Sequence, residues 1–392
     1  MASTNHYCAG FRFAGVAAGI KKRGGLDLGL AVADRPVVVA GAFTRNLVRA
    51  APLVVCERRV AAGRPVRAVL VNSGNANACT GEIGMQAVLT TSASVAAALG
   101  TTADEVLPAS TGVIGLPLAT EPITRAVPEL VAGLGSNADT FASAIMTTDR
   151  WPKIKLAEVA GARVLGVAKG AGMIHPDVGP PQATMLVFLF TDAVVERESL
   201  QHLLLAACDD SFNACSVDGD TSTNDTVLAL ASGASGVVVA DAKLGAAFTE
   251  VCRGLARSMV RDGEGAEHVA EIVVTGTATD AKARQVARTV ATSLLVKTAM
   301  SGCDANWGRF LAAAGRSGVP FDPHTARITI GGIQVVEHGL PVGAAAEERA
   351  GATMREPEYR IELEIGTGAG RATYLASDLG HGYVDVNAGY RS

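Results

Sequence analysis

The chain has 392 residues, 48% of them hydrophobic and 18% charged, which is enough to bury a large core in two domains or in one large domain with an appendage. The formal net charge is −4 and no block of like charge occurs, which argues against a nucleic-acid partner and an anionic membrane surface. Seven cysteines are scattered without a Cys-x-x-Cys pair, and no apolar run reaches transmembrane length. We therefore expect no disulfide framework, no metal site, no membrane association and a cytoplasmic location.

The first half of the chain alternates short apolar runs with helical patterns. Apolar runs rich in β-branched residues predict strands at 36–40, 52–56, 66–71 and 164–168. An Ala-rich stretch predicts a helix over 84–99, and a second helix is expected to end within 141–146. Together with the abundance of glycine and small aliphatic residues, this alternation indicates tightly packed α/β layers.

Three polar clusters lie between the predicted elements of this half. Asn72-Ser-Gly-Asn-Ala-Asn77 follows a predicted strand, where ligands bind in α/β sheets, although plain turns have the same composition. Ser110-Thr-Gly-Val-Ile-Gly115 is expected to be a tight loop that aims a hydroxyl and a backbone N–H at one point, as an oxyanion hole requires. An ordinary turn is the favoured alternative for that stretch alone. Thr147-Thr-Asp149 is either a helix cap or a substrate contact.

The central stretch is a Gly/Pro-rich loop over 169–184 that leads directly into the apolar run 185–190, which predicts a strand buried on both faces. If the Ala183–Thr184 bond were cut, Thr184 would carry a hydroxyl and a free α-amine on one residue. An α-amine titrates at about 7.7–8.0, so it can act as the base for its own hydroxyl. On this stretch alone, the simpler interpretation is that a β-branched residue opens a strand.

The second half predicts helices over 196–208, 244–260 and 280–291 and a strand at 272–275. The acidic stretch 217–225 lacks the glycine and glutamate of an EF-hand loop, so we interpret it as a polar turn near a site. Glu264 is expected to be exposed unless it meets a cationic ligand group. Further on we expect a hairpin over 326–336, a strand at 359–365, a hairpin turn at 366–370, a strand at 372–375 and a frayed C-terminal tail.

Taken in order, nine stretches resemble the glutamate/ornithine N-acetyltransferase family of arginine biosynthesis, and the likeness spans nearly the whole chain. Each stretch alone is weakly specific, whereas the ordered set is highly specific. The nine are Gly15-Val-Ala-Ala-Gly-Ile-Lys21, Asn72-Ser-Gly-Asn-Ala-Asn77, Ser110-Thr-Gly-Val-Ile-Gly115, Ala144-Ile-Met-Thr-Thr-Asp149, Lys169-Gly-Ala-Gly-Met-Ile174, Ala183-Thr-Met-Leu186, Val217-Asp-Gly-Asp-Thr-Ser-Thr-Asn-Asp-Thr226, Asp262-Gly-Glu-Gly-Ala266 and Cys303-Asp-Ala-Asn-Trp-Gly-Arg309.

The resemblance implies that the precursor cuts itself between Ala183 and Thr184 into an α chain (1–183) and a β chain (184–392). Thr184 then becomes the nucleophile, and the Thr111 hydroxyl and the Gly112 N–H form the oxyanion hole. By the same resemblance, the substrate-binding residues are Thr147 (with its neighbour Thr148 hard to exclude), Lys169, Thr184, Glu264, Asn387 and Ser392. The apparent tail would then return to the site.

The implied fold is a layered α/β sandwich of sheets and helices over 1–280 with a Thr N-terminal nucleophile, plus a smaller C-terminal α/β domain over 281–392. The implied function is transfer of the acetyl group from N2-acetyl-L-ornithine to L-glutamate through an acetyl–Thr184 intermediate. The family also implies a heterotetramer of two α and two β chains and no metal or redox cofactor. Whether acetyl-CoA is a further donor stays open.

One departure from the family pattern concerns the loop before the expected cut. Residues 177–182 lengthen it by roughly four residues, and its two consecutive prolines either pre-set or misplace the backbone for cleavage. Two alternatives therefore accompany the transferase. One is an amidase- or aminopeptidase-like hydrolase on the same fold, against which the Glu264, Asn387 and Ser392 set argues. The other is an uncleaved, non-enzymatic relative.

Overall fold

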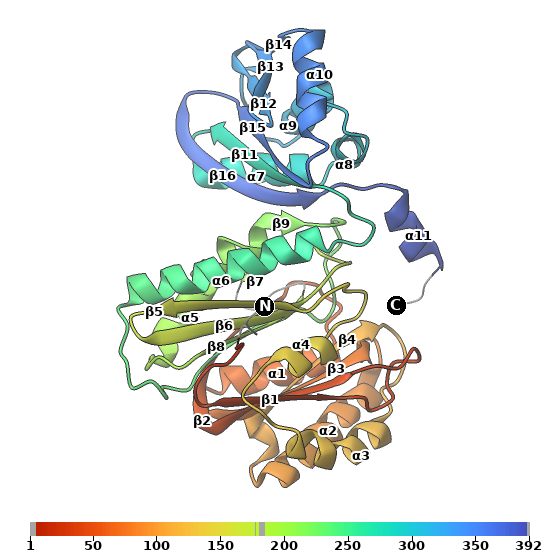
Figure 1. The fold of residues 1–392 in the computed structure, drawn as a ribbon, viewed down its shortest axis with the longest axis vertical. Helices are drawn as coiled ribbons and strands as arrows, with labels where there is room; N and C mark the ends of the chain where they lie inside the picture. The colour runs from red at the N-terminus through yellow and green to blue at the C-terminus, as the bar shows by residue number, and fades with distance from the viewer. Residues whose placement is uncertain (1–4, 177, 180–184, 390–392) are drawn as a thin grey trace.

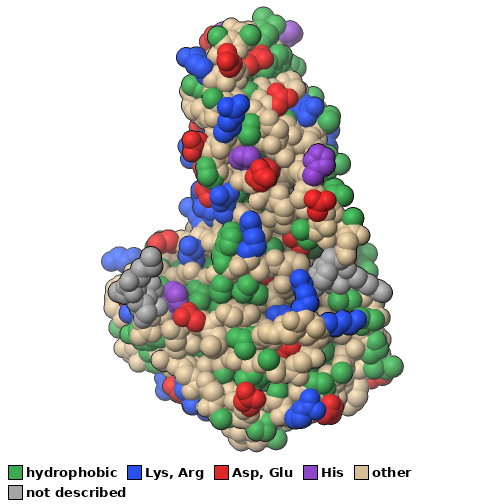
Figure 2. All heavy atoms as spheres, turned by 45° about the vertical axis from the view of Figure 1, so that its right-hand side comes forward, with side chains coloured by type: hydrophobic (Ala, Val, Ile, Leu, Met, Phe, Trp, Pro, Cys, Tyr) green, Lys and Arg blue, Asp and Glu red, His purple; other side chains and the backbone are tan. Residues whose placement is uncertain are grey.

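The computed structural model describes residues 5–176, 178–179 and 185–389, which form two sheets in two parts of the molecule (Figure 1). The larger sheet has the strand order β4-β3-β2-β10-β8-β6-β5, and β1 and β7 both pair with β2. The smaller sheet has the order β14-β13-β12-β15-β11-β16-β9. The smaller part stands as a narrow column on the wider one, and acidic and basic side chains are interspersed over the face shown in Figure 2.

The larger part contains nine described strands and six helices. The strands are β1 (Phe11–Val16), β2 (Leu28–Thr44), β3 (Val66–Asn75), β4 (Val106–Val113), β5 (Lys153–Val159), β6 (Ala162–Lys169), β7 (Val178–Gly179), β8 (Leu186–Thr191) and β10 (Thr226–Ala231). The helices are α1 (Ala51–Ala61), α2 (Gly81–Leu99), α3 (Thr120–Ala132), α4 (Asp139–Ala144), α5 (Arg197–Asp209) and α6 (Asp241–Arg261).

The long strand β2 runs through two halves of the larger sheet, and these halves pack face to face. Its first half pairs with β1 and β3 and its second half with β10, and the register shifts between Val32 and Val37. One apolar cluster fills the space between the two halves, where Phe13 and Phe141 meet Phe188 and Phe190. Helices α5 and α6 cover one outer face and α2 and α3 the other, so the order of layers is α/β/β/α (Figure 1).

Strand β8 is buried on both faces, as its continuous apolar run predicts. Leu186, Phe188 and Phe190 lie in the cluster between the two sheet halves, whereas Val187 and Leu189 pack under α5 and α6. The strand pairs with β10 in parallel and with β6 in antiparallel register. The strand that begins two residues after Thr184 therefore lies in the centre of the larger sheet.

The smaller part consists of a sheet with helices packed on it around its own core. Its strands are β9 (Cys215–Ser216), β11 (Val269–Gly276), β12 (Arg327–Ile330), β13 (Ile333–Glu337), β14 (Leu340–Pro341), β15 (Glu358–Glu364) and β16 (Gly368–Ser377). Its helices are α7 (Asp280–Ala291), α8 (Leu294–Ser301), α9 (Trp307–Gly315) and α10 (Ala344–Thr353), and α11 (His381–Gly389) follows the last strand. Because β11 belongs to this sheet, the change of sheet comes before residue 280, where the sequence analysis places the domain boundary.

Four local expectations are wrong for identifiable reasons. Residues 52–56 lie in helix α1, because Pro52 fits a first helical turn and Leu53, Cys56 and Val60 repeat at helical spacing on its buried face. The pair Thr111-Gly112 ends strand β4 and is not a loop.

Strands β15 and β16 do not form a hairpin, because β11 is inserted between them, parallel to β15 and antiparallel to β16. Residues 387–389 of the expected frayed tail instead end helix α11, which extends from the small part toward the large one (Figure 1), and 390–392 lie outside the described residues. The layered α/β fold class, the helix over 244–260 and the hairpin over 326–336 are confirmed.

Candidate active site

The C-terminal ends of strands β3 and β4 carry the two polar clusters and bring them together. The strands are parallel, and the register pairs Ser73 with Thr111 and Gly74 with Gly112. The Ser110 hydroxyl donates to Asn72 Oδ1 at 2.5 Å. The strand pairing and this hydrogen bond hold the two strand ends at a fixed separation, so the sheet sets the position of Thr111 and Gly112.

Gly112 occupies a position that no other residue can take. Its φ is +130°, and a Cβ added there would lie 2.3 Å from the carbonyl carbon of Gly74 and 2.5 Å from the amide nitrogen of Asn75. The backbone of β4 therefore approaches β3 more closely than a side chain permits. The close approach leaves the Thr111–Gly112 segment at the wall of a cavity.

A cavity of about 250 Å³ lies beside these strand ends. Of the residues predicted for the site, it is lined by Thr111, Gly112, Thr147, Thr148, Lys169, Glu264 and Asn387. Ala183, Thr184 and Ser392 lie outside the described residues, but Met185, the residue after Thr184, also lines the cavity. The fold therefore gathers predicted residues from both halves of the chain around one space.

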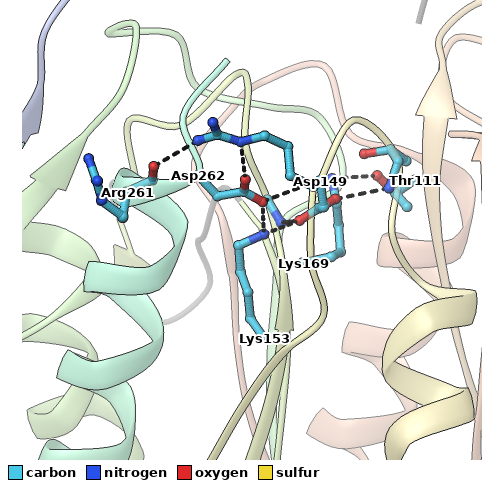
Figure 3. Close-up of polar contacts among 9 residues, drawn as sticks. Thr111, Asp149, Lys153, Lys169, Arg261 and Asp262 are labelled. Atoms are coloured by element: carbon cyan, nitrogen blue, oxygen red, sulfur yellow. Dashed lines mark hydrogen bonds and ion pairs between the residues drawn. The ribbon is translucent and has the colours of Figure 1, made fainter. Parts of the chain in front are cut away.

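Lys169, at the end of β6, contacts the predicted oxyanion-hole hydroxyl (Figure 3). Its Nζ donates to Thr111 Oγ1 at 3.2 Å. An ammonium group has no acceptor, so with Lys169 protonated the Thr111 oxygen accepts and its own proton is left for an acceptor in the cavity. Burial lowers the pKa of Lys169, and the nearby Asp149 carboxylate opposes that effect.

An ion network buried beneath Lys169 was not identified from the sequence (Figure 3). Lys153 Nζ lies 2.5 Å from Asp149 Oδ1 and 2.6 Å from Asp262 Oδ2, and all three side chains are fully buried. Asp262 also accepts from the Arg150 Nε at 2.7 Å. The i,i+4 spacing of Asp149 and Lys153 is the only signal that the sequence offers for it.

Asp149 connects this network to the cavity wall. Its carboxylate accepts the backbone N–H of Thr147 at 2.9 Å and that of Gly170 at 2.7 Å. Burial alone would raise the pKa of Asp149, but Lys153, Lys169 and the hydrogen bond from Thr147 together lower it to about 2. The network thus fixes the loop that carries Thr147 and the residue after Lys169 in one arrangement.

Helix α11 closes the opposite side of the cavity. Asn387 Nδ2 donates to Glu264 Oε2 at 2.9 Å, which joins the C-terminal segment to the 262–266 loop. Gly265 has φ +66°, and a Cβ there would lie 2.2 Å from the Gly382 carbonyl carbon, so the two backbones are in direct contact. A Cβ added to Gly172 would likewise lie only 2.3 Å from the Glu264 carboxylate and overlap with it.

Asp218, in the 217–225 stretch that was expected near a site, and Tyr383, which the sequence analysis did not name, also line the cavity. The Asp218 carboxylate accepts the backbone N–H groups of Met173 and Ile174 at 2.6 and 2.9 Å. Burial raises the pKa of Tyr383, and a hydrogen bond to Asp218 adds to the shift. Asp218 therefore joins the 172–174 loop to helix α11.

The cavity is lined by charges of both signs. Lys169 is its cation among the described residues, and the carboxylates come from Asp218, Asp220, Asp225 and Glu264. A molecule with a carboxylate at one end and an ammonium at the other matches this distribution of charge. Among the described residues, no group of three or more His, Cys, Asp or Glu side chains is arranged to hold a metal ion.

No helix in the described part of the chain is both long and apolar enough to cross a membrane.

Comparison with known proteins gives a match over almost the entire chain. The ArgJ family model matches residues 12–392. The arginine biosynthesis bifunctional protein ArgJ of Nitratidesulfovibrio vulgaris is 49% identical over 391 residues, covering 98% of this chain and 98% of that protein.

Two solved structures are also similar. The ArgJ of Bacillus halodurans is 40% identical with a TM-score of 0.50, covering 52% of this chain and 98% of the solved chain. The ornithine acetyltransferase of Mycobacterium tuberculosis, solved in complex with ornithine, is 40% identical with a TM-score of 0.42, covering 46% of this chain and 98% of the solved chain.

Proposed function

Because this chain belongs to the ArgJ family and is an acyltransferase of arginine biosynthesis, we propose that it moves the acetyl group of N2-acetyl-L-ornithine to L-glutamate through an acetyl–Thr184 intermediate. The observation that carries the proposal is the single cavity lined by Thr111, Gly112, Lys169 and Glu264 beside the residue that follows Thr184. The family match favours this reading over a hydrolase and over a non-enzymatic relative.

The first half-reaction forms the acetyl–enzyme. The Thr184 hydroxyl oxygen attacks the acetyl carbonyl carbon, and the α-amine of the same residue takes the hydroxyl proton. The Thr111 hydroxyl and the Gly112 N–H donate to the oxyanion of the tetrahedral intermediate. The amide C–N bond then breaks, and the protonated amine returns its proton to the α-nitrogen of the departing ornithine.

The second half-reaction reverses these steps with a different amine. The α-amine of L-glutamate attacks the acetyl–Thr184 carbonyl carbon, and the same two donors stabilise the oxyanion. The Thr184 α-amine accepts the proton of the attacking nitrogen and passes it to the departing Thr184 oxygen. The free enzyme is restored, and the scheme uses no metal or redox cofactor.

The charged side chains of the cavity suit the two charged groups of the proposed donor. N2-Acetyl-L-ornithine carries a carboxylate, for which Lys169 and the Thr147 and Thr148 hydroxyls are the proposed partners. Its δ-ammonium is proposed to pair with Glu264, which Asn387 already contacts at 2.9 Å. We assign Ser392 to the same region by the family resemblance.

Cleavage between Ala183 and Thr184 is part of the proposal, since only a free α-amine at Thr184 supplies the base. It is supported by the Bacillus halodurans structure, in which nearly the whole solved chain corresponds to about half of this one. We also propose a cytoplasmic heterotetramer of two α and two β chains. Acetyl-CoA is proposed as a second donor for the same intermediate, since the relatives are named bifunctional.

Two measurements on purified protein test the proposal. A denaturing gel should show two bands near half of 39.9 kDa for the parent and one band of full mass for Thr184→Val. Acetyl transfer from acetylornithine to glutamate should then be lost in Thr184→Val, and Thr184→Ser, which keeps a hydroxyl, should retain part of it. An active protein whose 183–184 bond is intact would overturn the proposal.

A further inference from the structure

A cysteine, a histidine and an aspartate contact one another in sequence outside the cavity, where the smaller part meets the 262–268 loop. Cys303 Sγ is 3.8 Å from His268 Nε2, and His268 Nδ1 is 3.3 Å from Asp378 Oδ2. Cys303 is partly exposed, whereas His268 and Asp378 are 9% and 2% exposed. A thiol at the surface thus lies over an imidazole, and the imidazole lies over a carboxylate.

The imidazole of this group is held by the backbone around it. Asp378 Oδ1 accepts the N–H groups of Glu267 and His268 at 3.0 and 3.1 Å, and the Asp378 N–H donates to the His268 carbonyl at 3.0 Å. With Nδ1–H donating to Asp378, the Nε2 of His268 carries the lone pair that faces the sulfur. Cys303 has φ +49° in the turn between α8 and α9, a conformation rare for a residue with a side chain.

We propose that Cys303 is a modification site that takes a low-molecular-weight disulfide, with His268 as its proton acceptor and Asp378 as a positioning residue. The Cys303 sulfur attacks one sulfur of the disulfide R–S–S–R while His268 Nε2 takes the thiol proton. A Cys303–S–R bond forms, the original S–S bond breaks, and the departing thiolate receives the proton from His268. No external oxidant is needed, because the disulfide itself is reduced to R–SH.

Cys303 differs from the other six cysteines in combining access with a base. Five of them are buried, and Cys79 is exposed with no histidine contact recorded for its sulfur among the described residues. Burial raises the pKa of the Cys303 thiol; Arg355 opposes that effect, whereas the Asp378 and Glu267 carboxylates add to it. The sulfur therefore keeps its proton at neutral pH, and its attack depends on the imidazole beneath it.

The position of Cys303 connects this chemistry to helix α11. Asp378 follows the last residue of β16, and the segment from it leads into α11, where Gly382 contacts Gly265. A group attached to Cys303 adds atoms to a sulfur that lies 3.8 Å from the His268 ring, and we expect it to disturb the position in which Asp378 holds that ring. We expect the 378–389 segment to loosen as a result. Neither the thiol chemistry nor this readout depends on the acetyl transfer proposed above.

The test uses 5,5′-dithiobis(2-nitrobenzoate), whose thiolate product is coloured, on the purified protein. In a Cys79→Ser background, one equivalent should react rapidly, peptide mass mapping should locate it at Cys303, and Cys303→Ser should remove the fast phase. His268→Gln should slow it at least about tenfold, which is a small share of what general-base catalysis supplies. A fast phase that survives in Cys303→Ser, or an unchanged rate in His268→Gln, would overturn the assignment.

Two measurements need no change at His268. Native Cys303 should react faster than the same residue in urea, where the three side chains are separated, and a faster reaction in urea would refute the role of His268.

Hydrogen exchange of the 378–389 amides should accelerate once Cys303 is thiolated, with the Cys303→Ser protein as the control. Unchanged exchange would refute the connection to helix α11.

Discussion

The buried ion network predicts a large and specific loss of stability when its lysine is removed. In Lys153→Met, Asp149 and Asp262 would both remain fully buried without the ammonium that now lies 2.5 and 2.6 Å from them. Removing one partner of a buried pair costs roughly 3–5 kcal/mol, and here the compensation of charge would fall to Lys169 for Asp149 and to Arg150 for Asp262. We expect a loss of that size in the free energy of unfolding, which is a large fraction of the total for a typical domain.

A matched exposed pair provides the control. Arg125 and Glu121 have the same i,i+4 spacing and the same 2.5 Å separation, but their side chains are 68% and 75% exposed. Arg125→Met is expected to cost less than about 0.5 kcal/mol, because solvent screens the pair. Both changes are best made in a Thr184→Ala background, in which the unprocessed chain unfolds as one polypeptide in urea. Equal losses for the two variants would refute the argument from burial.

The pH dependence gives an independent check on the same network. The pKa of Asp149 is about 2 in the folded chain and about 3.9 in an unfolded one, so its contribution to stability is complete above about pH 4 and is lost as the pH falls toward 2. Without Lys153 the folded pKa of Asp149 rises, which moves its protonation to higher pH. The difference between parent and Lys153→Met should therefore shrink from pH 5 to pH 3. A constant difference would contradict the assignment.

Three further predictions follow from the site and its surroundings. Gly112→Ala should lower the steady-state rate of acetyl transfer at least about 100-fold, because its Cβ meets the Gly74 backbone and displaces an oxyanion donor; a variant that keeps a tenth of the rate contradicts this. Glu264→Gln should raise the KM for acetylornithine by about 10- to 100-fold through loss of a charge-assisted hydrogen bond, and an unchanged KM would argue against that pairing. Burial lowers the pKa of Lys297 to about 8 against about 10.4 when unfolded, so its destabilising effect is full below pH 8 and disappears toward pH 10.4. In the Thr184→Ala background, the free energy of unfolding in urea of the protein with Lys297, minus that of Lys297→Met, should therefore rise by about 3 kcal/mol between pH 8 and pH 10.4. A difference that does not change with pH would refute the lowered pKa of Lys297.

Local sequence patterns predict much of this fold, because a helix or strand that is buried on one or both faces must carry apolar residues at a fixed spacing. The all-apolar run of β8 and the amphipathic face of α6 are of this kind, and both are observed as predicted. The stretch 52–56 is too short for its period to separate strand from helix, and only the residues after it, with Val60 completing the buried face, make the helix evident. The supposed hairpin at 366–370 fails for another reason, since no local pattern shows that β11 lies between its arms.

The chemistry of the site was predictable in kind from residue types and their order along the chain. The family resemblance assigned Thr111, Gly112, Lys169, Glu264 and Asn387 to the site, and the fold brings all five to one cavity. The same motifs place the nucleophile and cleavage point at Thr184 and Ala183, which lie outside the described residues, so their geometry stays a prediction. Residue identity suffices for this much because it fixes which functional group is available, a hydroxyl, an ammonium or a carboxylate.

Only the tertiary structure decided which groups support that chemistry. Lys153 lies against Asp262, 109 residues further along the chain, and Asn387 against Glu264 across 123 residues. Contacts of that range depend on strand order and layer packing, which no local window of sequence contains. The sequence therefore determined the reacting groups, and the fold determined the buried charges and the C-terminal helix that hold them in place, because desolvation and close contact exist only once distant segments have packed together.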